Sequence, residues 1–302
     1  MSKLSVVVPC YNEEGVAPLF YKEAIIHIKE CSKSYEIIFV NDGSKDNTLN
    51  ELIELKKKDN NINIIDFSRN FGKEAAMLAG LKEAKGDFVT IMDVDLQDPP
   101  SLLKEMYDVV KSGEYDCVAT RRVTRKGEPP IRSFFARCFY KLINKMIEVE
   151  IVDGARDFRM MTRPMVDSII SLPEHNRFSK GIFAWVGFNT KYIEFENQER
   201  IAGTTKWSFW KLFKYAIEGI VSFTTMPLTL AIIFGILSFI ASVVLLIASI
   251  ANIINVSNFA LLVVVLFLSS IQFFSLGVIG EYIAKTYTEV KDRPNYIIKK
   301  KY

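Results

Sequence analysis

A stretch of about 60 residues without a charged side chain is the feature that most limits what this chain can fold into. No Asp, Glu, Lys or Arg lies between Glu218 and Glu281. A soluble core hardly tolerates such a gap, whereas a helix that crosses the hydrocarbon core of a bilayer needs about 20 apolar residues. We therefore expect two membrane-spanning helices, over residues 227–250 and 259–279, within a two-helix region at residues 227–284.

Basic side chains flank both expected spans on the side away from the short loop that joins them. By the positive-inside rule, this asymmetry predicts a multi-pass protein of the cell inner (plasma) membrane, with the N-terminal domain and both termini in the cytoplasm. Residues 285–302 are expected to form a basic cytoplasmic tail that is attracted to anionic lipid. The flanking cations are Lys206, Lys211, Lys214, Lys285, Lys291, Arg293 and residues 299–301.

Residues 207–226 carry polar side chains at helical spacing within an otherwise apolar and aromatic segment. We expect an amphipathic juxtamembrane helix here, with Trp207 and Trp210 at the depth of the lipid headgroups. A helix buried beneath the preceding domain is the alternative, because the amphipathic pattern suits both. Residues 131–149 also mix basic and aromatic side chains, and there a membrane-facing surface and a solvated helix face both stay open.

The first 120 residues or so alternate short apolar runs with amphipathic ones. This alternation is typical of βαβ units and predicts an α/β domain with a Rossmann-like, mainly parallel sheet, which we place at residues 1–206. The expected strands are residues 4–8, 36–40, 63–67, 87–92 and 115–119. The expected helices are residues 15–31, 48–58, 73–84 and 100–111.

Polar residues follow each of the first four expected strands, at positions 11–13, 41–44, 68–73 and 93–98. In an open α/β sheet, ligands bind beyond the carboxyl ends of the strands. A single polar ending is compatible with an ordinary turn, but four in succession indicate a binding cleft.

The acidic run at residues 93–98 (Asp-Val-Asp-Leu-Gln-Asp) is the most informative of these endings. Asp93 and Asp95 are two positions apart, so their carboxylates point to one side of an extended segment. Two such oxygen anions offer hard ligands for Mg²⁺ or Mn²⁺, above all where a diphosphate supplies the remaining ligands, and the amide of Gln97 follows just behind them. Asp98 precedes two prolines, and we expect it to cap the next helix instead of binding the metal.

Composition argues against several classes of function. The net charge of +3 is too small to indicate nucleic acid as a partner. The four cysteines are widely spaced and the two histidines are isolated, which disfavours a zinc site. No Gly-x-Gly-x-x-Gly follows the first strand, so dinucleotide binding is also disfavoured.

Five segments in this order resemble family 2 glycosyltransferases: residues 9–14, 41–46, 70–73, 93–100 and 157–159. The likeness is strongest to the polyprenyl-phosphate glycosyltransferases, the group of dolichol-phosphate mannose synthase and the bacterial bactoprenol-phosphate glucosyltransferases. It covers nearly the whole chain and includes the paired C-terminal spans. The resemblance implies a GT-A catalytic domain that transfers one sugar, with inversion, from a nucleotide-diphosphate sugar such as UDP-glucose to undecaprenyl or another polyprenyl phosphate. Glucose is the first choice, and N-acetylglucosamine and galactose stay open.

The resemblance also implies roles for individual residues. The donor would be bound by Pro9, Tyr11 and Glu13 around the uracil base, by Asp42 at the nucleoside, and by Lys73, Asp93, Arg200 and Lys206. The metal would be bound by Asp93, Asp95 and Gln97. The implied catalytic residues are Asp157, Asp95 and Arg159. Arg200 and Lys206 lie in a loop that covers the donor or meets the acceptor phosphate in such enzymes. Asp153 competes with Asp157 for the role of the acidic residue.

A phosphate acceptor changes what an acidic residue has to do. A phosphate monoester has a second pKa of about 6, so it is mostly dianionic at pH 7 and needs little help from a base. We therefore expect Asp157 to orient the acceptor pocket, together with Arg159. The cations available to bind the phosphate are Arg159, Arg177, Lys180, Arg200 and Lys206.

Two other functions stay open at this point. A processive polysaccharide synthase shares the catalytic domain, but it usually has more spans and a Gln-x-x-Arg-Trp motif, which this chain lacks. A membrane-anchored nucleotide-sugar binding protein without turnover is the other, and the intact Asp93, Asp95 and Asp157 argue against it. Related bacterial enzymes suggest a homo-oligomer that assembles through the spans.

Overall fold

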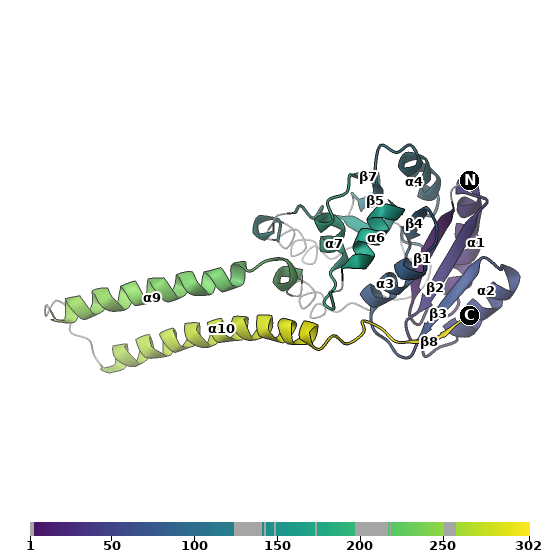
Figure 1. The fold of residues 1–302 in the computed structure, drawn as a ribbon. Helices are drawn as coiled ribbons and strands as arrows, with labels where there is room; N and C mark the ends of the chain where they lie inside the picture. The colour runs from purple at the N-terminus through teal and green to yellow at the C-terminus, as the bar shows by residue number, and fades with distance from the viewer. Residues whose placement is uncertain are drawn as a thin grey trace. The chain divides into compact units, whose positions relative to one another are not determined.

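We describe the protein from a computed structural model, which divides the chain into two compact units. It describes residues 3–123, 141, 143–147, 149–172, 174–196, 217, 219–250 and 258–302. The first unit comprises Met1–Lys214 together with Pro294–Tyr302, and the second is Tyr215–Arg293. Figure 1 follows both along the chain.

A mixed sheet forms the centre of the first unit, with the strand order β7-β5-β6-β4-β1-β2-β3-β8 among the described residues (Figure 1). The four neighbours β4, β1, β2 and β3 are parallel to one another, which confirms the mainly parallel α/β sheet predicted for the catalytic domain. The strands are β1 Leu4–Cys10, β2 Tyr35–Asn41, β3 Ile62–Phe67, β4 Phe88–Ile91, β5 Cys117–Arg122, β6 Ala155–Thr162, β7 Thr190–Phe195 and β8 Ile298–Lys301.

Helices cover both faces of this sheet. On one face α1 packs against α2 and α4, and on the other α3 packs against α6. Alternate residues of β1 face the two helix layers on either side of the sheet. Val6 and Val8 join the core cluster with Phe20, whereas Val7 faces α3. A Cβ at Gly80 would lie 2.2 Å from a methyl carbon of Val7, so glycine permits the close approach of α3. The helices are α1 Val16–Cys31, α2 Thr48–Lys58, α3 Lys73–Glu83, α4 Leu102–Lys111, α6 Arg163–Ser171 and α7 Ser179–Trp185.

Strand β6 was not expected from the sequence. It lies between β4 and β5 and is antiparallel to both. Its alternation explains the dense mixture of charged and apolar residues seen there: Phe158 and Met160 belong to the core, whereas Asp157 and Arg159 point to the opposite side. Apolar and charged residues alternate in β6 with the period of a strand, but the charged side chains of Asp157 and Arg159 are at most partly exposed to solvent.

The end of the chain corrects the expectation of a separate basic tail over residues 285–302. Helix α10 continues to Val290, and β8 pairs antiparallel with β3. The backbone of Tyr302 exchanges hydrogen bonds with Ile64, at 3.0 and 3.3 Å between nitrogen and oxygen. An edge strand such as β3 leaves backbone N–H and C=O groups without partners, and β8 supplies them.

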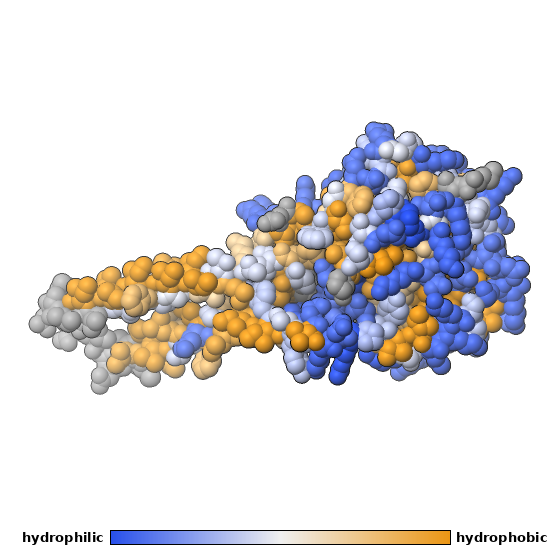
Figure 2. Space-filling model, in the orientation of Figure 1, coloured by the Kyte–Doolittle hydropathy of each residue, from blue (hydrophilic) through white to orange (hydrophobic). Residues whose placement is uncertain are grey.

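The second unit contains two long apolar helices, α9 (Met226–Ile250) and α10 (Asn258–Val290). Both are long and apolar enough to cross a membrane, and their most apolar stretches are not buried by protein. Figure 2 shows hydrophobic residues over the visible faces of both helices. Their bounds agree with the spans expected at 227–250 and 259–279, except that α10 extends further. Most of the expected juxtamembrane helix (207–226) and of the segment 131–149 lies outside the described residues.

Candidate active site

Hydrogen bonds join the loops that follow β1 and β2. The backbone N–H of Asn12 donates to the hydroxyl of Ser44 at 2.9 Å, and the N–H of Lys45 donates to the side-chain carbonyl of Asn12 at 2.9 Å. Asn12 has a φ of 52°, a left-handed conformation that asparagine tolerates. The two loops therefore act as one polar edge at the carboxyl ends of the parallel strands, where ligands of such sheets bind.

Asp42, at the end of β2, organises the loop between β3 and α3, which we call the β3–α3 loop (residues 68–72). Its buried carboxylate accepts hydrogen bonds from the N–H groups of Phe71 (2.6 Å) and Gly72 (2.9 Å). The side-chain amide of Asn70 donates to it at 2.8 Å. Burial raises the pKa of Asp42, although these donors oppose the rise. In this structure the Asp42 carboxylate accepts hydrogen bonds from the loop. Its expected contact with the nucleoside stays a prediction.

Lys73 opens α3 and joins two carboxylates from distant parts of the chain. Its ammonium nitrogen lies 2.7 Å from Asp93 and 2.6 Å from Asp157. Burial raises the pKa of Asp157, but the Lys73 ammonium, with Lys180 and Arg159, outweighs burial and holds it well below the ordinary value. Asp157 is therefore ionised at neutral pH and is a weak base.

Asp95 and Gln97 lie in the turn that follows β4. The N–H of Gln97 donates to the Asp95 carboxylate at 3.2 Å. Leu96 between them has a left-handed φ of 56° and buries its own side chain. The turn thus fixes the Asp95 carboxylate against the backbone of Gln97, two residues after Asp93 in the chain. No group of three or more acidic, His or Cys side chains is assembled among the described residues. Carboxylate and amide oxygens still suit a divalent cation, provided that a diphosphate and water supply its other ligands.

Pro9, Tyr11 and Glu13 follow one another at the end of β1, and all three are partly exposed. Pro9 still belongs to β1, opposite Val40 of β2. The backbone of Glu13 is fixed, since its N–H donates to the Thr48 hydroxyl at 2.8 Å and its carbonyl accepts from the start of α1. The structure places these residues at the same edge as Asp42, and their contact with a base stays a prediction.

Asp98 does not have the role expected from the sequence. Its side chain is 1% exposed, and its Oδ1 lies 2.8 Å from the guanidinium of Arg156. The N-terminus of α4 has no side-chain cap from it. Burial raises the pKa of Asp98 to about 6, and Arg156 opposes the rise. Asp98 therefore pairs with Arg156, which is 58 positions away in the chain. Sequence spacing alone does not reveal such a pair.

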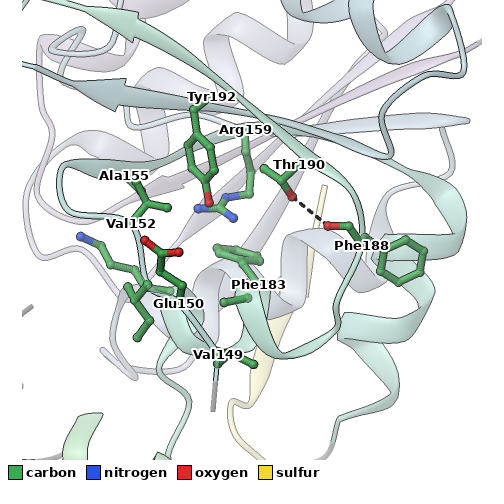
Figure 3. Close-up of a pocket in the computed structure, with 12 residues that line it drawn as sticks. Val149, Glu150, Val152, Ala155, Arg159, Phe183, Phe188, Thr190 and Tyr192 are labelled. Atoms are coloured by element: carbon green, nitrogen blue, oxygen red, sulfur yellow. Dashed lines mark hydrogen bonds between the residues drawn. The ribbon is translucent and has the colours of Figure 1, made fainter. Parts of the chain in front are cut away.

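Arg159 lines a cavity of about 250 Å³ between β6, β7 and α7, whose walls mix apolar side chains with polar ones, among them the carboxylate of Glu150 (Figure 3). Its side chain is 4% exposed, and its guanidinium carbon lies 3.6 Å from the centre of the Phe183 ring. One terminal nitrogen donates to the carbonyl of Arg156 at 2.9 Å, but Nε has no hydrogen-bond partner among the described residues. A buried donor without a hydrogen-bond partner costs free energy of folding, so a ligand oxygen that accepts a hydrogen bond from this nitrogen would bind favourably in the cavity. Lys180 and Tyr192 line the same cavity.

The structure separates the other candidates for an acidic or cationic role. Arg177 donates to the carbonyls of Leu172 (2.8 Å) and Ile169 (3.3 Å), so it stabilises the end of α6 and is wrong as a phosphate ligand. Asp153 lines a second cavity of about 430 Å³, whereas Asp157 contacts the Lys73 ammonium at 2.6 Å, and this contact favours Asp157. Arg200 and Lys206 lie outside the described residues.

Glu74 is a residue of this site that we did not anticipate. Its carboxylate accepts hydrogen bonds from the hydroxyl and, at 3.2 Å, from the backbone N–H of Ser179, the first residue of α7. It thus ties α3 to the helix that carries Lys180 and Phe183. An acidic residue in the first turn of a helix is ordinarily explained by the helix dipole, so no distinct sequence signal points to this contact.

We expect Glu74 to make folding stability depend on pH. Burial, reinforced by Asp157, raises its pKa from 4.5 to about 6 in the folded protein. The folded state then binds more protons than the unfolded state in this interval, so stability falls as the pH rises from about 4.5 to about 6. The melting temperature of Glu74→Gln should therefore rise relative to wild type across this window. Parallel curves for the two proteins would contradict the assignment.

Comparisons with known proteins agree with this geometry. The family model described as Glycosyl transferase family 2 matches residues 5–170. A prophage bactoprenol glucosyl transferase homolog of Escherichia coli (strain K12) is 43% identical over 99% of this chain and 99% of that protein. The bactoprenol glucosyl transferase of Shigella phage SfII is 42% identical over 99% and 98% of the two chains.

A glycosyltransferase of Synechocystis sp. is 43% identical over 98% of this chain and 94% of its own length. The matched region contains the acidic end of β4, Lys73 and Asp157, and these relatives align over α9 and α10 as well. The chain belongs to glycosyltransferase family 2 and is a glycosyltransferase.

Proposed function

We propose that this enzyme transfers one hexose, glucose in the first instance, from a UDP-sugar to a polyprenyl phosphate at the cytoplasmic face of the cell membrane. The observation that carries the proposal is the adjacency of two sites. Asp157, which joins Lys73 and Asp93 beside the donor loops, and Arg159, which lines a cavity, project from the same face of β6. The names of the full-length relatives, bactoprenol glucosyl transferases, support a polyprenyl phosphate as acceptor.

The donor side needs positive charge for the departing nucleoside diphosphate. Asp93, Asp95 and Gln97 would hold Mg²⁺ or Mn²⁺, which supplies a Lewis acid for the diphosphate when bound. Lys73 supplies a fixed positive charge from the chain itself, because two carboxylates hold its ammonium group. Burial lowers the pKa of Lys73, but Asp157 and Asp93 outweigh burial and keep it protonated.

The acceptor side needs cations next to apolar side chains, and the cavity of Arg159 offers both, together with the carboxylate of Glu150. The Arg159 guanidinium and the Lys180 ammonium line a cavity whose other walls include Val149, Phe183 and Phe188. Such a cavity suits a phosphate monoester joined to an isoprenoid chain, since the head requires forked donors and the tail requires apolar contact. In the reaction, an acceptor oxygen forms a bond to the anomeric carbon while the bond to the diphosphate oxygen breaks. Direct displacement inverts the anomeric centre, and the electron pair leaves with the nucleotide.

No proton has to move, because the acceptor phosphate is already dianionic near pH 7. We therefore propose that the Asp157 carboxylate holds the Lys73 ammonium group in place and orients the neighbouring wall of the acceptor cavity. Asp157→Asn should lower kcat by no more than about tenfold, or about 1.4 kcal/mol of barrier, with the pH profile of kcat unchanged. A much larger loss that external base or high pH restores would show that Asp157 accepts a proton.

The apolar helices α9 and α10 give the enzyme its place in this scheme. A polyprenyl phosphate keeps its tail in lipid and its phosphate at headgroup depth, so an enzyme anchored in the same bilayer meets it at high effective concentration. We place both termini and the catalytic unit in the cytoplasm, because the basic flanks of the spans predict that topology. A homo-oligomer formed through the spans also belongs to the proposal.

The test is an assay of the purified full-length protein with undecaprenyl phosphate and a panel of labelled nucleotide sugars. We expect a labelled lipid from UDP-glucose, seen by thin-layer chromatography, and its loss on adding a chelator of divalent cations. Restoration by Mg²⁺ or Mn²⁺ identifies the metal. A polymeric product would support a processive synthase, and binding of the donor without any product would support a protein without turnover.

A further inference from the structure

The chain end contacts the β3–α3 loop. Strand β8 pairs with β3, and the N–H of Ser68 donates to the carbonyl of Ile297 at 3.0 Å, which fixes the first residue of the loop. Just before β8, the ring of Tyr296 stacks on Phe67, with ring centres 5.0 Å apart and an angle of 11° between the planes. Figure 1 shows the C-terminal strand beside β3 at the edge of the sheet. The segment that follows the apolar helices is therefore part of the catalytic unit.

The aromatic contact continues from β3 into the loop. Phe67 meets Phe71 edge to face, with ring centres 5.8 Å apart. The guanidinium carbon of Arg69 lies 3.9 Å from the centre of the Phe71 ring. The N–H of Phe71 donates to Asp42, so one line of contacts leads from Tyr296 through Phe67 and Phe71 to the carboxylate at the end of β2.

The loop depends on such contacts because its middle is exposed. Ser68, Arg69 and Asn70 are all exposed, and the side chains of Arg69 and Asn70 make their contacts with Phe71 and Asp42. The two anchors are the Asp42 carboxylate at one end and the chain end at the other. Lys73 follows directly after this loop, so the backbone that carries its ammonium group to Asp93 and Asp157 starts from these anchors.

We propose that Tyr296 is a positioning residue of the donor site, holding the β3–α3 loop in the shape that binds the nucleotide sugar. The donor site is then completed by a residue that lies beyond both apolar helices in the sequence. This inference rests on the proposed function, because it takes the loop edge near Asp42 and Lys73 as the place of the donor. It assigns no chemistry to Tyr296, whose ring acts through Phe67 and Phe71.

The test compares Tyr296→Leu with wild type in the full-length protein in detergent. Leucine keeps apolar volume but has no flat face to stack on Phe67. We expect the Kd for UDP, measured by calorimetry, and the KM for the sugar donor to rise about tenfold, which corresponds to about 1.4 kcal/mol. The KM for the lipid phosphate and kcat should stay within about twofold of wild type. Tyr296→Phe keeps the ring and should restore donor affinity.

Two further variants separate positioning from general stability. Lys301→Ala removes the 2.5 Å ion pair between Lys301 of β8 and Glu83 at the end of α3, and it should leave the affinity for UDP unchanged. Phe71→Leu breaks the aromatic line without altering β8 and should weaken UDP binding as Tyr296→Leu does, which keeps the test valid where the latter does not fold. Unchanged UDP affinity in both aromatic variants, or equal losses in Lys301→Ala, would overturn the inference. Wild-type protein that binds no UDP would contradict the proposed function instead.

Discussion

Replacing Asp93 and Asp95 together by asparagine is expected to reduce sugar transfer on the order of a thousandfold. The two carboxylates provide the negative charge that holds a divalent cation against the donor diphosphate, and loss of such electrostatic stabilisation typically costs about 10²–10³ in rate. Asp93 also balances the Lys73 ammonium, at 2.7 Å, so the change loosens the cation that the chain itself supplies. The measurement is the initial rate of transfer to undecaprenyl phosphate at saturating donor.

A matched control removes two negative charges elsewhere. Glu105 and Asp108 lie on α4, away from the donor loops in the chain, and Asp108 pairs with Lys104 on the same helix. The double variant Glu105→Gln, Asp108→Asn should transfer sugar at the wild-type rate. If Asp93→Asn, Asp95→Asn retained that rate as well, the account of the donor site would be wrong.

Arg159→Gln should raise the KM for the lipid phosphate by about 100-fold, which corresponds to about 2.7 kcal/mol. The guanidinium is buried, and its Nε has no partner among the described residues, so an acceptor phosphate gains a strong charge-assisted contact there. Arg159→Lys keeps the positive charge but loses the forked pair of donors. Its KM for the lipid phosphate should lie between that of wild type and that of Arg159→Gln. The measurement varies undecaprenyl phosphate in mixed micelles at fixed donor.

The KM for the donor distinguishes this role from a general effect on folding. It should stay within about twofold of wild type in Arg159→Gln, because the guanidinium faces the acceptor cavity. Lys191→Gln is the matched control: this residue precedes Tyr192 on β7, but its ammonium lies 5.7 Å from the centre of the Tyr115 ring. An unchanged KM for the lipid phosphate in Arg159→Gln would refute the assignment of the cavity.

The sequence predicted well those parts of the fold that depend on local pattern. The parallel strands β1 and β2 are buried on both faces, so they read as continuous apolar runs. The helices α9 and α10 follow from the absence of charge between Glu218 and Glu281. Asp93 and Asp95 could be predicted from the sequence as metal ligands, because a buried strand ends there and a local role such as a helix cap explains neither carboxylate.

The unpredicted parts depend on contacts between residues far apart in the chain. Lys73 joins Asp157 across 84 positions, and Asp98 joins Arg156 across 58. Spacing cannot tell which carboxylate a cation selects, so Asp98 was assigned to a helix cap. Strand β8 was missed for a similar reason: a run of lysines suits a solvated tail, and only the free edge of β3 makes it a strand.

The most direct test of the central claim identifies both products of one reaction. Full-length protein is incubated with UDP-glucose and undecaprenyl phosphate, the nucleotide is separated by chromatography, and the lipid is weighed by mass spectrometry. The account predicts UDP and a lipid that carries one hexose and one phosphate, in equal amounts. Release of UMP with a lipid diphosphate, or of UDP with free glucose alone, would contradict transfer of a sugar to a lipid phosphate.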